Sequence, residues 1–364
     1  QLEEMLDYFG QSPFIVRSSS LLEDNYGNAF AGTYESVFCA NQGPREERLQ
    51  NLLAAIREIY ASSMSEKALR YRADRGMLDR DEQMALLVMR VSGTLHGQYF
   101  YPQLAGVGFS FNPYAWAPDI DPQAGVARLV FGLGTRAVNR SDDDYTRIVA
   151  LNAPGKRPET NFDEVAQFAQ RRMDFLDLAA NRLASDYFSD VVRDGEDLPL
   201  DLLTTEAPSP HDSSAPPNRV LTFDALLTRT NFVRDLCEML HALQTAYCHP
   251  VDIEFTANFL DPRRYKINLL QCRPLQIQGT SAIELPEISV APEDLILSAR
   301  GAVVGQSRVA RIDRLVYVSP DIYSQLPLQD RHEIARVVGE INRAGGAETT
   351  LLVGPGRWGS TSPH

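Results

Sequence analysis

The feature that most limits the fold of this chain is the alternation of short apolar runs with longer segments of helical spacing. Apolar side chains recur three or four positions apart from about residue 45 to residue 74, which predicts a long helix or a helix pair. Four apolar runs have the length of buried strands: residues 14–16, 83–91, 105–111 and 128–131. Strands that alternate with helices in this way favour a mixed α/β or α+β fold.

The second half of the chain continues this pattern with one interruption. Helical spacing returns over residues 161–192 and again over 223–246. Two more strands are predicted, 251–256 and 265–272, on either side of the turn-forming pair Asp261-Pro262. The interruption is the segment 193–219, in which five prolines accompany Ser, Asp and Glu. This composition predicts a flexible surface insertion and not a core element.

Past residue 279 we expect a separate β-rich unit, a small α/β domain with strands at 315–318 and 350–353 and a helix at 331–343. Its glycine-rich run at 354–360 allows two interpretations, a phosphate contact or a turn that supports Trp358, and the second is favoured. The chain begins without Met and stops soon after this run, so we expect it to be a fragment of a longer protein.

Length and composition restrict the class of protein. A chain of 364 residues suggests two or three domains, and no apolar stretch reaches the roughly 20 residues that span a bilayer. The net charge of −13 makes nucleic acid and anionic membranes unfavourable partners. The four cysteines form no CxxC pair and have no metal-ligand spacing, which fits reduced thiols in a cytoplasmic protein.

The first candidate site residue is Arg17, which leaves the strand predicted at 14–16 and is followed by three serines. An arginine at a strand end presents a fixed positive fork to a polyphosphate. Small residues after it let backbone N–H groups approach phosphate oxygens. Glu23-Asp24 and the segment 28–32 extend the pattern. The alternative interpretation is a strand end followed by a capped loop, which spacing alone favours.

A second group combines Asp252 and Glu254 with Gln271 and Arg273, on the two strands that flank the Asp261-Pro262 turn. Side chains alternate along a strand, so each pair shares a face. If the two faces coincide, the carboxylate and amide oxygens suit Mg²⁺ and the guanidinium suits a phosphate. The alternative is a cross-strand ion pair on an exposed sheet face, which the spacing alone favours.

The third candidate is the run Gly132-Leu133-Gly134-Thr135-Arg136, directly after a predicted strand. Glycines in this position form a turn that a nucleotide can approach closely. When the run is taken alone, the GxG signal is weak and an ordinary tight turn is the favoured interpretation.

The order of these motifs is more specific than any one of them. The chain carries VRSSSLLED, FAGTYES, YR at residues 71–72, AGVGFSFNP, GLGTRAV, DIEF and LLQCRPLQ, in that order. Over residues 14–276 this succession resembles the PEP/pyruvate-binding, ATP-grasp nucleotide-binding domain of the phosphoenolpyruvate synthase and pyruvate phosphate dikinase family. The resemblance implies that two α+β lobes clamp ATP. We expect the lobes at residues 1–110 and 111–280, and the additional unit at 281–364.

The resemblance also implies roles for single residues. Arg17 falls on the phosphate-contacting arginine and Arg273 on the arginine that closes the phosphate end, so both are expected to be catalytic. Glu254 and Gln271 are expected to be Mg²⁺ ligands. The cofactor-binding residues expected from the resemblance are Arg17, Gly132, Gly134, Asp252, Glu254, Gln271 and Arg273.

The function implied is an ATP- and Mg²⁺-dependent phosphotransferase of the phosphoenolpyruvate synthase kind. ATP would phosphorylate a carrier histidine outside this fragment, which then passes the group to pyruvate or another acceptor. Three departures stand against a complete site: Thr135 replaces the acidic residue of GLGE, no glycine-lysine segment precedes Phe14, and no carrier-histidine run is present. The alternatives are therefore a non-catalytic ATP-binding regulatory module and a purely structural interaction domain.

Overall fold

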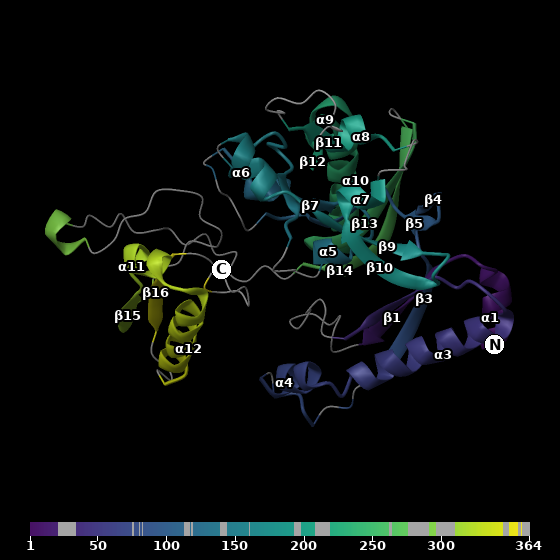
Figure 1. Cartoon of the computed structure of the whole chain (residues 1–364), viewed down its shortest axis with the longest axis horizontal. Helices are drawn as coiled ribbons and strands as arrows, with labels where there is room; N and C mark the ends of the chain where they lie inside the picture. The colour runs from purple at the N-terminus through teal and green to yellow at the C-terminus, as the bar shows by residue number, and fades with distance from the viewer. Residues whose placement is uncertain are drawn as a thin grey trace. The chain divides into compact units, whose positions relative to one another are not determined.

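The computed structural model divides into two compact units, unit 1 with residues 1–278 and 302–304, and unit 2 with residues 279–301 and 305–364. Unit 1 mixes α-helices with antiparallel sheets, which confirms the mixed α and β class (Figure 1). The structure describes residues 1–20, 34–74, 76–79, 81, 83–112, 117, 119–138, 144–159, 161–192, 198–207, 219–261, 264–275, 291–295, 310–344, 349–355 and 358.

The N-terminal part of unit 1 is a three-stranded antiparallel sheet in the order β2-β1-β3. Its strands are β1 (Phe14–Ser20), β2 (Ser36–Cys39) and β3 (Met84–Arg90). The helices beside it are α1 (Leu2–Phe9), α3 (Arg45–Ser62) and α4 (Glu66–Asp74). Leu6, Phe14, Leu52 and Ile59 are buried together in one cluster, so α1 and α3 pack against the sheet (Figure 1). Of the two alternatives predicted over 45–74, a long helix or a helix pair, the structure has the pair.

The centre of unit 1 is a five-stranded antiparallel sheet in the order β14-β13-β6-β7-β8. Its strands are β6 (Leu104–Phe109), β7 (Val126–Val130), β8 (Arg147–Ala150), β13 (Val251–Asp261) and β14 (Arg264–Pro274). The hairpin of β13 and β14 confirms the two strands predicted around residue 261. Strand β6 pairs with both β7 and β13, while the lobe boundary at 110 remains a prediction.

Two smaller sheets complete unit 1, one of four strands in the order β10-β9-β5-β4 and one formed by β11 and β12. Their strands are β4 (Thr94–His96), β5 (Tyr99–Tyr101), β9 (Arg172–Asp177), β10 (Arg182–Tyr187), β11 (Thr204–Glu206) and β12 (Arg219–Leu221). The helices are α5 (Thr135–Val138), α6 (Phe162–Gln167), α7 (Phe188–Val191), α8 (Leu200–Leu203), α9 (Asp224–Arg229) and α10 (Phe232–Tyr247).

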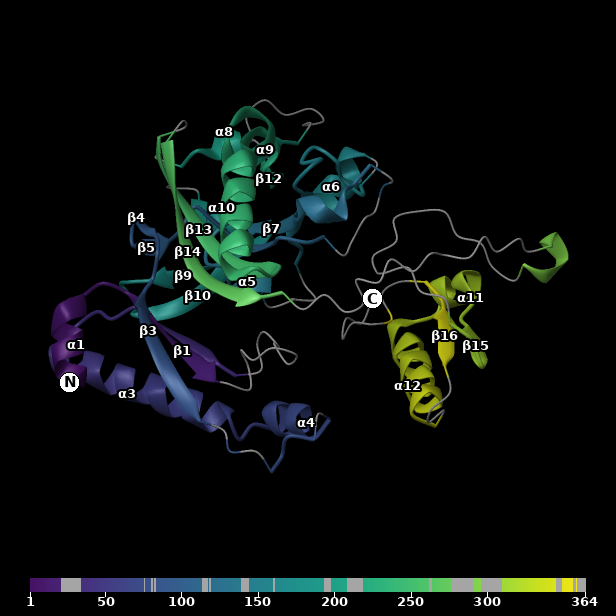
Figure 2. The ribbon, with the colours of Figure 1, turned by 180° about the vertical axis from the view of Figure 1, so that it is seen from behind.

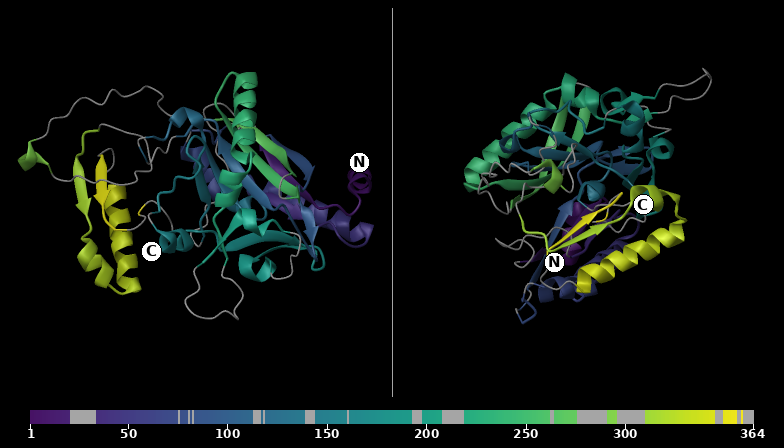
Figure 3. Two further views of the ribbon diagram at one scale, coloured as in Figure 1. Left: turned by 90° about the horizontal axis from the view of Figure 1, so that it is seen from above. Right: turned by 90° about the vertical axis from the view of Figure 1, so that its left-hand side faces the viewer.

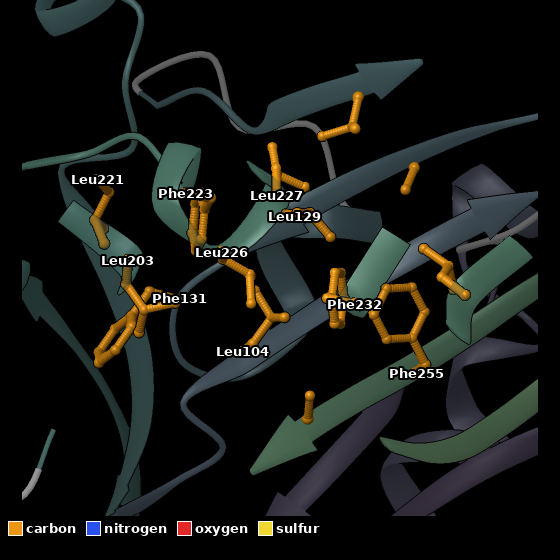
Figure 4. Packing of buried hydrophobic residues seen from close by; sticks show 14 of the residues in the cluster. Leu104, Leu129, Phe131, Leu203, Leu221, Phe223, Leu226, Leu227, Phe232 and Phe255 are labelled. Carbon is orange, nitrogen blue, oxygen red and sulfur yellow. The ribbon is translucent and has the colours of Figure 1, made fainter. Parts of the chain in front are cut away.

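The main core lies where α9 and α10 cover the five-stranded sheet (Figure 2). Leu104, Leu129 and Phe255 from the sheet are each at most 1 % exposed, as is Phe232 at the start of α10. Figure 4 shows these side chains beside Leu226 of α9. Burial of each such side chain contributes about 1.5–3 kcal/mol of transfer free energy, so this cluster fixes the sheet that carries most of the candidate residues.

The prediction of helix throughout 161–192 is wrong. Only α6 and α7 are helical there, and β9 and β10 form a hairpin between them. Met173 and Phe175 alternate with polar residues and point into the core, which is strand periodicity. Asn181 adopts a φ of 52° at the turn, a conformation that asparagine tolerates.

The prediction that 193–219 is wholly a surface insertion is wrong for the part that the structure describes. Residues 198–207 contain α8 and β11, and Leu203 of α8 is fully buried in the main core. The leucines at 198, 200, 202 and 203 give this stretch an apolar surface to bury. Residues 193–197 and 208–218 lie outside the described residues.

Unit 2 has two parallel strands, β15 (Arg314–Tyr317) and β16 (Thr350–Val353), and two α-helices, α11 (Pro320–Gln325) and α12 (Leu328–Ala344). Figure 3 shows the two strands side by side. The strands at 315–318 and 350–353 and the helix at 331–343 are confirmed. Over the residues described here, the unit is α/β with more helix than strand, and the expectation of a β-rich unit is not met within them. No helix in the described parts of the chain is long and apolar enough to cross a membrane.

Candidate functional site

A cavity of about 970 Å³ lies within unit 1 and brings together segments that are far apart in the sequence. The strands β1, β2 and β3 contribute to its lining, and so do β13 and β14 of the five-stranded sheet. The turn after β7 and strand β9 contribute as well, through residues 133–135 and Asp174. The cavity therefore contains the meeting point of three of the sequence-predicted motifs.

Arg17 reaches from β1 to the hairpin of β13 and β14. One terminal nitrogen donates to Glu254 Oε2 at 2.8 Å, and the other donates to Gln271 Oε1 at 2.6 Å. Glu254 and Gln271 are register partners on adjacent strands, so a single guanidinium fork bridges both side chains. The side chains of Arg17 and Glu254 are 18 % and 10 % exposed, which makes this a largely buried charge pair.

Arg273 occupies the next position of the same hairpin face, opposite Asp252. Its guanidinium lies 3.4 Å from Asp252 Oδ2 and 3.7 Å from Glu254 Oε1. The two predicted faces therefore coincide, and the group is buried instead of lying on an exposed sheet face. Arg273, Glu254 and Gln271 line the cavity.

Asp252 is the member of this group that lies behind the cavity lining. Burial raises the pKa of Asp252 to about 6, opposed by the nearby charge of Arg273 and reinforced by that of Glu254. Among the described residues its Oδ1 atom is buried without a hydrogen-bond partner. The geometry makes Asp252 a partner that orients Arg273, and its direct contact with a cofactor remains a prediction.

The turn after β7 is held against β9 by backbone contacts. Leu133 N donates to Asp174 O at 2.9 Å, and Gly132 has a φ of 89° that L-residues rarely adopt. A Cβ on Gly132 would lie 2.8 Å from Asp174 O. Gly132 therefore permits the close approach, while Leu133 and Gly134 reach the cavity wall.

Asp174 is a cavity residue that the sequence analysis missed. Its two carboxylate oxygens accept from Thr135 Oγ1 at 2.5 Å and from Arg136 Nε at 3.0 Å. Arg136 also pairs with the buried Asp144, so the turn ends in a charged network. Because residues 161–192 were assigned to helix, the periodicity gave no reason to place Asp174 beside Thr135.

Ser92 is a second missed residue in the cavity lining. Its hydroxyl oxygen is within hydrogen-bond distance of Thr256 Oγ1 at 2.8 Å, Asn268 Nδ2 at 2.9 Å and Asn258 Nδ2 at 3.2 Å. A Ser-Gly pair after a strand predicted only a strand end, and nothing local signalled this convergence. The predicted residues Glu23-Asp24 and 28–32 lie outside the described residues.

In a comparison with protein-family models, the model for the pyruvate phosphate dikinase AMP/ATP-binding domain matches residues 1–288. The chain belongs to this family. The family resemblance predicted from the ordered motifs is thereby confirmed, and the chain carries an AMP/ATP-binding domain of a phosphotransferase family. A comparison with curated proteins gave no match.

The AMP/ATP-binding domain spans almost all of unit 1 and includes every segment that lines the cavity. Most of unit 2 follows the matched residues. The family thus supports nucleotide binding by unit 1, and the cavity is the place in the described residues where acidic, amide and guanidinium groups meet.

Proposed function

We propose that unit 1 binds ATP together with Mg²⁺ in the 970 Å³ cavity, in the manner of an ATP-grasp domain. The observation that carries the proposal is the convergence of Arg17, Glu254, Gln271 and Arg273 on one part of the cavity of a domain from an ATP-binding family. In this assignment the phosphates lie at these four side chains and the nucleoside extends toward Gly134 and Thr135.

The donor set fits Mg²⁺, which binds oxygen ligands and usually keeps several waters together with substrate phosphates. Glu254 contributes a carboxylate and Gln271 an amide oxygen, and the two are opposite each other in the strand register. When bound, Mg²⁺ would neutralise part of the phosphate charge and polarise the phosphoryl group. Histidine and cysteine are absent from this set, so nothing in it favours a softer metal.

The side chains of the cavity would position and neutralise the triphosphate. Arg17 and Arg273 offer planar forks that hold phosphate oxygens in bidentate fashion. Because phosphoryl transfer depends mainly on positioning and on charge stabilisation, two arginines in one part of the cavity are suited to it. We propose that the acceptor is a carrier histidine outside residues 1–364, which then passes the group to pyruvate or another small acceptor.

The binding part of this proposal is tested by titrating the purified chain with ATP, with and without Mg²⁺, and measuring the affinity by calorimetry. Glu254→Gln keeps the shape of the side chain and removes its charge, so we expect the Mg²⁺-dependent affinity for ATP to fall by about tenfold or more. The matched control is Glu238→Gln on the exposed face of α10, which should leave the affinity unchanged. If Glu254→Gln retained the full Mg²⁺ dependence, the metal assignment would be wrong.

A non-catalytic ATP-binding regulatory module is the second candidate, and Thr135 favours it because a hydroxyl stands where the family pattern has a carboxylate. The full-length protein separates the two. Incubation with radiolabelled ATP should label a histidine if the protein is a phosphotransferase. Binding of ATP without any labelled histidine would support the regulatory module.

A further inference from the structure

Arg17 donates to one carboxylate oxygen of Glu254 and to the amide oxygen of Gln271, the two groups that the proposed function assigns to the metal. Its two terminal nitrogens lie 2.8 Å from Glu254 Oε2 and 2.6 Å from Gln271 Oε1. The guanidinium is rigid and planar, so its two donors match this pair of acceptors as one unit. These two oxygens are thus already in contact with a cation that belongs to the chain itself, the guanidinium of Arg17.

A divalent metal and this guanidinium compete for the same two oxygens. Mg²⁺ binds oxygen ligands at about 2.0–2.1 Å, and a metal held by both oxygens would lie in the space that the Arg17 nitrogens occupy. The two cations also repel each other, and burial of Arg17 and Glu254 weakens solvent screening of that repulsion. A metal held by Glu254 Oε2 and Gln271 Oε1 therefore requires Arg17 to give up both hydrogen bonds.

A polyphosphate changes this balance because it offers Arg17 another partner. Phosphate oxygens accept bidentate hydrogen bonds from a guanidinium, and they bind Mg²⁺ at the same time. The cost of removing Arg17 from Glu254 and Gln271 is then offset by its new contacts. A free metal ion provides no hydrogen-bond acceptor to replace the ones that Arg17 would lose.

We propose that Arg17 is the residue that makes this site selective for a metal–nucleotide complex over the free metal ion. The inference rests on the proposed function, since it uses Glu254 and Gln271 as metal ligands. It assigns Arg17 two successive roles: a cation that occupies the two acceptors before a ligand binds, and a phosphate ligand once the nucleotide binds. A purely structural Arg17, which only ties β1 to the hairpin, would have neither effect on ligand choice.

The proposal is tested by measuring two affinities of the variant Arg17→Met. The affinity for Mn²⁺ alone is measured by electron paramagnetic resonance, and the affinity for MgATP by calorimetry. Arg17→Met keeps an unbranched apolar stem in place of the aliphatic part of Arg17 and removes its charge and donors. We expect Mn²⁺ alone to bind at least about tenfold more tightly than to the unmodified protein, and MgATP to bind at least about tenfold more weakly. Opposite changes cannot come from a general loss of structure, which would weaken both.

Controls separate this proposal from the proposed function. Arg45→Met removes an exposed arginine that pairs with Asp7 outside the cavity, and it should change neither affinity. Adding Glu254→Gln to Arg17→Met should abolish the gain in Mn²⁺ affinity. Should Arg17→Met fail to fold, Arg17→Lys replaces the fork with one ammonium group, and a smaller rise in Mn²⁺ affinity is expected.

The outcomes are distinguishable. If the unmodified protein binds MgATP in a metal-dependent way but Arg17→Met binds Mn²⁺ no more tightly, Arg17 does not compete with the metal and this inference is overturned. If the unmodified protein shows no metal-dependent ATP binding, the proposed function itself fails. If the Mn²⁺ gain survives Glu254→Gln, the metal binds elsewhere and the inference is also overturned.

Discussion

The substitution Gly132→Ala tests how tightly the cavity turn is fixed against β9. Gly132 has a φ of 89°, and a left-handed conformation costs an L-residue about 1–2 kcal/mol. The added Cβ would lie 2.8 Å from the backbone oxygen of Asp174, which can move only with strand β9. Forcing atoms into a packed site costs about 1–3 kcal/mol. Allowing about 0.4–1 kcal/mol for the reduced entropy of the unfolded chain, we expect a net loss of about 1–4.5 kcal/mol.

Gly134→Ala is the matched control two residues away. Gly134 has no left-handed φ, and its added Cβ would lie 3.4 Å from the Cβ of Ala105, an ordinary van der Waals contact. The same chemical change should therefore alter the free energy of unfolding by less than about 1 kcal/mol. The comparison keeps the effect of a methyl group on the unfolded chain nearly constant, so the difference reports the folded turn.

The free energy of unfolding of both variants is measured by equilibrium unfolding in urea, with far-ultraviolet circular dichroism as the signal. The free energy comes from the midpoint and the slope of the transition, and an unchanged slope is needed for a direct comparison. Gly132→Ala should unfold at a clearly lower urea concentration than Gly134→Ala. Two variants within about 1 kcal/mol of each other would refute the reasoning, because neither the backbone conformation nor the contact with Asp174 would then constrain position 132.

Two further predictions concern buried ionisable groups. Iodoacetamide should label the exposed Cys248 and spare Cys39, because burial raises the pKa of the Cys39 thiol to about 12; peptide mass spectrometry gives the rates, and equal labelling would contradict the burial. Asp144→Ala should lower the free energy of unfolding by about 2–4 kcal/mol, because its buried carboxylate accepts from three backbone N–H groups and pairs with Arg136. Asp119→Ala, which breaks a surface pair, should have a much smaller effect in the same urea measurement.

The hairpin of β13 and β14 is the part of the site that the sequence predicts best. Alternation along each strand and the turn at Asp261-Pro262 are both local signals, and together they bring the two polar faces opposite each other. The register pairs Asp252 with Arg273 and Glu254 with Gln271, which is the coincidence of faces on which the sequence-based prediction depended.

The contact of Arg17 with this hairpin has no local signal. Arg17 and Glu254 are separated by 237 positions, and they meet because two different sheets pack around one cavity. In the sequence, only the family resemblance connects the motif that contains Arg17 with the motif that contains Glu254. Asp174 was missed for another reason: the helical assignment of 161–192 removed the strand alternation that places its side chain beside Thr135.

The cavity lining therefore contains two kinds of interaction: contacts that hold the turn at Gly132 in place, and contacts of Arg17 that a ligand would have to replace. The turn at Gly132 and the Thr135–Asp174–Arg136 contacts involve the backbone and a charged network, and they hold one wall of the cavity against β9. The contacts of Arg17 are made instead to the side chains that would have to release it when a metal and a phosphate bind. Arg17 joins β1 to the hairpin and is the side chain expected to exchange partners. We therefore expect ligand binding to change the contact between these two sheets more than the strand pairing within either sheet.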